Sequence, residues 1–114
     1  MSRQASGLKA WLVQRITAIY LGLFCSYLVL HFAIAAPADY AAWRAWVAQP
    51  LVSLGWLLFI PVLLAHAWVG LRDVLMDYVK PIGLRVALLS LTALVFLASG
   101  LWAVRAIILA GLEG

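Results

Sequence analysis

Residues 51–71 read LVSLGWLLFIPVLLAHAWVGL and carry no formal charge over twenty-one positions. A helix needs about 20 consecutive apolar residues to cross the hydrocarbon core of a bilayer, since each residue advances only about 1.5 Å. This stretch is therefore predicted to be a membrane-spanning helix. Pro61 lies in its interior and is expected to kink or loosen the helix locally.

Two other uncharged runs, residues 16–36 and 86–104, have similar lengths. Hydrophobic residues make up 68% of the 114-residue chain and charged residues only 11%, whereas a soluble domain is about half apolar and a quarter charged. The sequence thus predicts an all-α membrane protein with three transmembrane helices in a single domain, 1–114. Three helices bury little surface among themselves, so we expect partner subunits and lipid to cover the rest.

The segments between these runs are predicted to be short connections. Residues 1–10 resemble an exposed arm, and residues 37–50 an interfacial connection, because Trp43 and Trp46 suit the headgroup region. Residues 72–85 hold five of the twelve charges and are predicted to be the second loop. A short tail follows Arg105.

A cleaved signal peptide is an alternative for the first run, because the small residues of Ala33-Ile34-Ala35 follow a basic start. The run is longer than the roughly 7–15 residues of a signal core, and His31 interrupts it, so we expect it to be retained. The single cysteine, Cys25, excludes a disulfide framework within the chain.

The distribution of Lys and Arg predicts the orientation. Six lie in the N-terminal region up to Arg15 and in residues 72–85, against Arg44 and Arg105 in the other two connections. The positive-inside rule then places the N-terminus and residues 72–85 in the cytoplasm. The basic pI of about 9.7 reflects these topology signals, and no nucleic-acid partner is expected.

His66 is the first candidate for chemistry, because an ionisable side chain within a span is costly and usually functional. In a continuing helix His66, Gly70, Asp73 and Asp77 share one narrow stripe. Imidazole is a common haem ligand, and Gly70 would let a flat macrocycle lie against the helix. The residues equally allow a packing histidine, with Gly70 at a close helix contact.

His31 is the only other histidine. It lies roughly 22 Å from the cytoplasmic edge, and His66 roughly 8 Å, if each residue advances about 1.5 Å. Axial nitrogens on one iron are only about 4 Å apart, so a bis-histidine haem would need a histidine from another chain. We expect His31 to be a polar packing residue.

Asp77 and Tyr78 follow the second span. A phenol can donate a hydrogen bond to a quinone carbonyl, and a neighbouring carboxylate can orient it or pass protons. From the residues alone, the ordinary interpretation of an interfacial tyrosine and a helix-end aspartate is preferred. Arg15 and Arg72 could neutralise haem propionates or contact lipid phosphates. No nucleophile–base pair, phosphate loop or thiolate metal site is recognisable.

Together these residues resemble a known family. The fragments RITA at 15–18, HAWVG at 66–70 and DYVKP at 77–81, with Arg85 after them, look like the hydrophobic membrane anchor subunit of bacterial succinate dehydrogenase. The resemblance covers the whole chain, including its three spans and the eleven residues from His66 to Asp77.

The resemblance implies a role for each position. His66 would be an axial ligand of haem b, with the second ligand from a cytochrome b556 anchor subunit, in a heterodimeric anchor helix bundle. Tyr78 would hydrogen-bond ubiquinone and Asp77 would support it, while Gly70 would pack on the haem. Arg15 would lie near the haem propionates or the quinone.

The resemblance also implies partners and a place in the cell. A flavoprotein subunit would oxidise succinate and pass electrons through an iron–sulfur subunit docked on the cytoplasmic face of the bacterial inner membrane. This chain would do no succinate chemistry. A fumarate reductase anchor, a purely structural membrane anchor and a free-standing cytochrome b are the alternatives.

Overall fold

The computed structural model describes residues 3–113, which fold into four helices: α1 (Arg3–Ala35), α2 (Tyr40–Ala48), α3 (Pro50–Tyr78) and α4 (Ile82–Glu113). Three segments are long and apolar enough to cross a membrane, Gly7–Ala35, Pro50–Tyr78 and Ile82–Leu112. The predicted all-helical fold with three candidate spans is therefore confirmed. The short helix α2 occupies most of the connection predicted at residues 37–50.

Local sequence determines where the helices begin and end. The Asp39 carboxylate accepts a hydrogen bond of 2.8 Å from the Ala42 backbone N–H at the start of α2, a cap that contributes about 1 kcal/mol. Pro50 begins α3, where its missing N–H leaves no helical bond unmade. Pro81 disfavours a helical conformation at Lys80, and α3 ends just before it, at Tyr78.

The helices extend beyond the predicted spans, and the expected loop at residues 72–85 needs correction. The arm expected at residues 1–10 is helical from Arg3, and the tail after Arg105 remains helical to Glu113. The loop expected at residues 72–85 contains only residues 79–81 without helix. The reason is that charge ends a hydrophobic span but does not end a helix, and no proline intervenes before Pro81.

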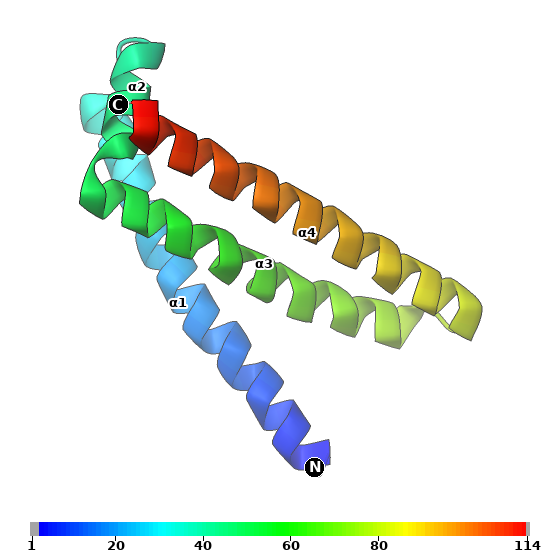
Figure 1. Ribbon diagram of the computed structural model, residues 1–114. Coiled ribbons are helices and arrows are strands. Elements are labelled where there is room, and N and C mark those ends of the chain that lie inside the picture. The colour runs from blue at the N-terminus through cyan, green and yellow to red at the C-terminus, as the bar shows by residue number, and fades with distance from the viewer. Residues whose placement is uncertain (1–2, 114) are drawn as a thin grey trace.

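Helix α3 is the centre of the bundle (Figure 1). Helix α1 packs on α3 from Gly55 to Gly70 and then diverges from it towards the N-terminus. Helix α4 returns along α3 and ends beside α2. Within the described residues α1 and α4 do not pack on each other. Beyond the contact between Gln14 and Gly70, the N-terminal part of α1 and the C-terminal part of α3 lie apart (Figure 1).

Aromatic rings join α1, α2 and α3 at the other end of the bundle. This aromatic cluster comprises Tyr20, Phe24, Tyr27, His31, Phe32, Trp46, Trp56 and Phe59. The Tyr20 hydroxyl donates a hydrogen bond of 2.7 Å to the Gly55 carbonyl. A Cβ atom at Gly55 would lie 2.7 Å from the Phe24 ring, so glycine permits this close approach of α1 to α3.

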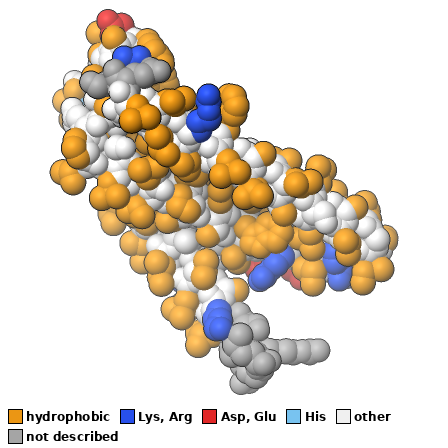
Figure 2. Space-filling view, in the orientation of Figure 1, with side chains coloured by type: hydrophobic (Ala, Val, Ile, Leu, Met, Phe, Trp, Pro, Cys, Tyr) orange, Lys and Arg blue, Asp and Glu red, His pale blue; other side chains and the backbone are white. Residues whose placement is uncertain are grey.

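The bundle has a small interior. Among the described residues the buried hydrophobic side chains are Trp46, Val52, Val69 and Ile107. Hydrophobic side chains cover the face shown in Figure 2 along α3 and α4. Exposed apolar area on this scale marks contact with lipid or other subunits.

Candidate functional site

The side chain of His66 connects α3 to α1. Its Nδ1 atom lies 3.0 Å from the Oγ1 atom of Thr17, and Thr17 is buried at 8% exposure. Thr17 also bonds within its own helix, with Oγ1 2.5 Å from the Val13 carbonyl oxygen. The imidazole is therefore held in place by a hydroxyl group that is itself fixed to helix α1.

A hollow of about 570 Å³ opens beside this pair. We call it the His66 hollow, and it lies between the N-terminal half of α1 and the C-terminal half of α3. Its lining residues are Gly7, Ala10, Trp11, Gln14, Arg15, Ala18, His66, Arg72 and Asp73. Its volume is within the range of small-molecule and cofactor sites, about 300–1,000 Å³.

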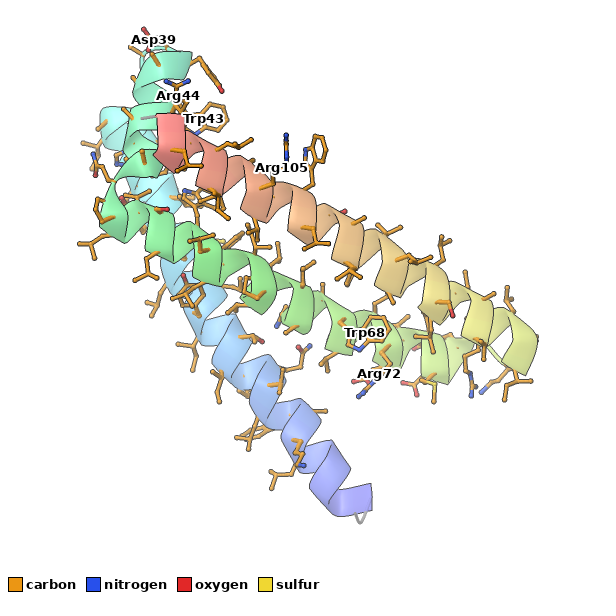
Figure 3. All side chains as sticks on the ribbon, viewed as in Figure 1. Asp39, Trp43, Arg44, Trp68, Arg72 and Arg105 are labelled. Atoms are coloured by element: carbon orange, nitrogen blue, oxygen red, sulfur yellow. The ribbon has the colours of Figure 1, made fainter. Side chains whose placement is uncertain are left out.

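Two guanidinium groups border the His66 hollow. Arg15 lies with its Cζ atom 5.7 Å from the centroid of the Trp11 ring. Arg72 Nη2 lies 3.3 Å from Asp73 Oδ1, an exposed pair that contributes little to stability. Arg72 projects from α3 into the open space on the α1 side (Figure 3). The structure thus places Arg15 and Arg72, from different helices, around one imidazole.

Gln14 and Gly70 occupy the contact between the two helices. The Gln14 Oε1 atom is buried and has no hydrogen-bond partner within the described residues. A Cβ atom at Gly70 would lie 3.5 Å from Gln14 Nε2, an ordinary van der Waals distance. Gly70 therefore faces α1, and Gln14 is the side chain opposite it.

Asp77 and Tyr78 lie at the C-terminal end of α3, both exposed. The exposed fraction of Tyr78 is 79%. Asp77 continues the stripe of His66 and Gly70, because α3 is one unbroken helix over these residues. Tyr78 is twelve residues beyond His66, about 18 Å along the helix. These two residues are therefore at the edge of the bundle, outside the His66 hollow.

Arg85 holds the end of α3 in place from the first turn of α4. Its Nε donates a hydrogen bond of 3.0 Å to the Val79 carbonyl, and its Nη2 donates one of 3.1 Å to the Met76 carbonyl. Carbonyl groups in the last turn of a helix lack helical partners, and a cation there also interacts favourably with the helix dipole. Arg85 thereby positions the segment that carries Asp77 and Tyr78.

His31 lies in a different environment. Its ring stacks on that of Trp46, with centroids 4.6 Å apart and an angle of 8° between the planes. His66 contacts α1 at Thr17, fourteen residues before His31, or about 21 Å along α1. The structure therefore separates the two imidazoles, in agreement with the sequence-based estimate, and places His31 within the aromatic cluster.

The sequence analysis did not predict the contacts made by three residues, Thr17, Gln14 and Arg85. Thr17 stands in the fragment at 15–18, but nothing in the sequence paired it with His66. Gln14 lies on the same face of α1 one turn before Ala18, a position that only the packing of α1 and α3 makes relevant. Arg85 is a basic residue after Pro81, and its capping role depends on the tight connection at 79–81.

Comparison with known proteins identifies the family of this chain. A relative from Coxiella burnetii, described as "Succinate dehydrogenase hydrophobic membrane anchor subunit", is 31% identical over 99 residues, which cover 87% of this chain and 86% of the relative. The family model described as "Succinate dehydrogenase/Fumarate reductase transmembrane subunit" matches residues 1–105. The chain therefore belongs to the family of succinate dehydrogenase/fumarate reductase transmembrane subunits.

Proposed function

We propose that this chain is the hydrophobic membrane anchor of a succinate dehydrogenase, that His66 is an axial ligand of haem b, and that Tyr78 and Asp77 form part of a quinone-reduction site. The observation that carries the proposal is the His66 hollow. It combines one fixed imidazole with two guanidinium groups in a space of cofactor size.

The residues of the His66 hollow fit a haem group. Haem carries an iron that binds imidazole nitrogen and two propionates that carry negative charge. His66 offers the nitrogen, while Arg15 and Arg72 offer opposite charge for the propionates. The buried Oε1 of Gln14 also lies at this site without a hydrogen-bond partner among the described residues. Haem bound here would accept and release one electron.

This chain supplies only one histidine to the hollow. Among the described residues there is no group of three or more His, Cys, Asp or Glu side chains that could hold a metal. His31 is in the aromatic cluster, too far away to share an iron with His66. A second ligand of such a haem would therefore come from a partner, for which a second haem-binding anchor subunit, cytochrome b556, is the candidate.

Tyr78 is available to a quinone at the end of α3. Its side chain is 79% exposed, and within the described residues no hydrogen bond engages its hydroxyl group. A phenol in this position can donate a hydrogen bond to a quinone carbonyl. Asp77 precedes it and can orient the hydroxyl or pass a proton, and Arg85 keeps both on a fixed helix end.

The exposed apolar surface supports assembly with other subunits in the bacterial inner membrane. An iron–sulfur subunit would dock beside Tyr78 and receive electrons from a flavoprotein subunit. The distribution of Lys and Arg favours the cytoplasm for this end of the bundle. The quinone would then be reduced where the anchors meet the iron–sulfur subunit.

The matching family includes both succinate dehydrogenases and fumarate reductases. We favour succinate dehydrogenase because the relative from Coxiella burnetii carries that name and matches nearly the whole chain. On this basis ubiquinone is the expected acceptor. A fumarate reductase would instead use a quinone of lower potential, so the quinone bound to the purified complex separates the two.

Gentle detergent extraction of the tagged chain, followed by mass spectrometry, tests the proposed assembly. We expect a flavoprotein, an iron–sulfur protein and a second small haem-binding membrane subunit to co-purify, with succinate:quinone reductase activity in the same fraction. Recovery of the chain alone, from membranes in which such subunits are expressed, would contradict the proposal.

A further inference from the structure

We propose that Thr17 is a positioning residue for the haem site: its hydroxyl group accepts a hydrogen bond from His66 Nδ1–H and so leaves His66 Nε2 as the nitrogen that binds iron. This inference rests on the proposed ligation of haem by His66. It adds a residue on α1 that selects which of the two ring nitrogens is available.

The inference follows from the single proton of the Thr17 hydroxyl. Three atoms lie within hydrogen-bonding distance of Oγ1: the Val13 carbonyl oxygen at 2.5 Å, the Gln14 carbonyl oxygen at 3.2 Å and His66 Nδ1 at 3.0 Å. A carbonyl oxygen can only accept a hydrogen bond. Each carbonyl contact therefore requires the hydroxyl proton of Thr17, and the Val13 oxygen is the closer of the two carbonyl oxygens.

The opposite assignment, in which Thr17 donates to His66, leaves a close repulsive contact between the Thr17 and Val13 oxygens. If Thr17 donated its proton to Nδ1, two lone-pair oxygens of Thr17 and Val13 would face each other at 2.5 Å without a hydrogen between them. With the proton on the Val13 side, Oγ1 presents a lone pair to His66, and Nδ1 must be the donor.

Neutral imidazole carries one N–H, so protonation at Nδ1 leaves the lone pair at Nε2. Thr17 is the only hydrogen-bond partner of either His66 ring nitrogen among the described residues. The His66 side chain lines the hollow. The free nitrogen is thereby set by a contact made on helix α1, before any iron is bound.

Burial makes this contact specific. Thr17 is 8% exposed, and its back-bond to Val13 prevents its hydroxyl from rotating freely. Partners of this kind, which bind the second nitrogen of a metal-ligating histidine, fix the ring orientation and raise its basicity. Their loss typically costs about ten- to hundredfold in metal affinity or activity.

The test compares Thr17→Val with Thr17→Ser in the purified complex. Valine keeps the shape of threonine but cannot accept the hydrogen bond, whereas serine can. A less basic imidazole stabilises ferric haem less, so Thr17→Val should raise the midpoint potential. A tenfold loss in the preference for ferric over ferrous iron corresponds to about 59 mV for one electron.

Redox titration and the low-spin ferric EPR spectrum provide the readouts, neither of which depends on turnover. Ser26→Ala is the matched control, since the Ser26 hydroxyl makes the same type of back-bond in α1, 2.7 Å to the Gly22 carbonyl, on an exposed face. We expect Thr17→Val to shift the potential and the spectrum, or to lose haem, while Thr17→Ser and Ser26→Ala resemble the wild type.

Two results would overturn the role of Thr17. One is a Thr17→Val complex with the wild-type potential and spectrum; the other is an equal change in Thr17→Ser, which would mean that the side chain only fills space. His66→Ala keeps the two proposals separate. If it retains haem, ligation by His66 fails; if it loses haem while Thr17→Val is unchanged, only the inference about Thr17 fails.

Discussion

The two histidines of this chain occupy opposite kinds of environment. His31 is stacked on Trp46 within the aromatic cluster, where rings from three helices meet. His66 is held by a hydroxyl group at the edge of a hollow that also contains Arg15 and Arg72. One imidazole is packed as an aromatic ring, and the other is the proposed haem ligand.

The two histidines mark two ends of the bundle that differ in packing: one is closely packed and the other is open. The aromatic cluster fixes α1 against α3 through ring contacts, each pair contributing about 0.5–1.5 kcal/mol beyond burial. Beyond it α1 diverges from α3 towards the N-terminus, and Gln14, Arg15, His66, Arg72 and Asp73 line the hollow between these helices. If the proposed binding site lies at the open end, changes at the two ends should have separable effects on stability and on haem or quinone binding.

The largest expected effect on activity without loss of stability is at Tyr78. Tyr78→Phe removes the proposed hydrogen-bond donor to quinone, and loss of such a bond costs about 1–3 kcal/mol. We therefore expect the rate of succinate-dependent quinone reduction to fall about tenfold or more, with subunit assembly and haem content unchanged.

Tyr40→Phe is its control, because Tyr40 is similarly exposed, at 70%, but lies on α2 at the aromatic end. Its quinone reduction should equal that of the wild type. Wild-type turnover in Tyr78→Phe would contradict a role for Tyr78 in quinone binding. It would also count against a functional difference between the two ends of the bundle.

Gly55→Ala should instead reduce stability and leave the haem unaltered. The added methyl group would lie 2.7 Å from the Phe24 ring, and such overpacking costs about 1–3 kcal/mol. The thermal unfolding midpoint of the purified complex should fall, while its haem spectrum stays as in the wild type.

Gly22→Ala is the matched substitution on α1, where nothing lies within 4 Å of the added Cβ atom. It should leave the midpoint unchanged or raise it slightly, because alanine favours helix more than glycine does. A Gly55→Ala complex as stable as the Gly22→Ala complex would show that the aromatic cluster does not fix the two helices.

The most local effect is expected at Arg85, confined to the end of α3. Arg85→Met removes two hydrogen bonds to the end of α3, each worth about 0.5–1.5 kcal/mol. Hydrogen exchange should become faster at residues 76–79. Arg105→Met, which removes a cation stacked 5.4 Å from the Trp102 ring, should leave exchange in that segment unchanged; equal exchange in both variants would exclude a capping role for Arg85.

The sequence predicted the helical fold because its signal is simple. Three uncharged runs of sufficient length require helices in a bilayer, and the residue-level stripe of His66, Gly70 and Asp77 depends only on helical periodicity. Helix ends are harder to predict: the charges within residues 72–85 predict a loop, but α3 continues to Tyr78 and ends only before Pro81.

Contacts between helices could not be predicted from one sequence. The pairing of Thr17 with His66 joins residues forty-nine positions apart, and it depends on how α1 crosses α3. The stacking of His31 on Trp46 likewise depends on the turn between α1 and α2. Periodicity places a residue on a face, whereas only the packing shows what that face meets.

The most direct test of the central claim is the reduced-minus-oxidised haem spectrum of the purified complex carrying His66→Ala, beside the same complex carrying His31→Ala. We expect the b-type haem signal to be lost or strongly reduced in His66→Ala and retained in His31→Ala. Retention of the full signal in His66→Ala, or its loss in His31→Ala alone, would contradict the assignment of His66 as the haem ligand.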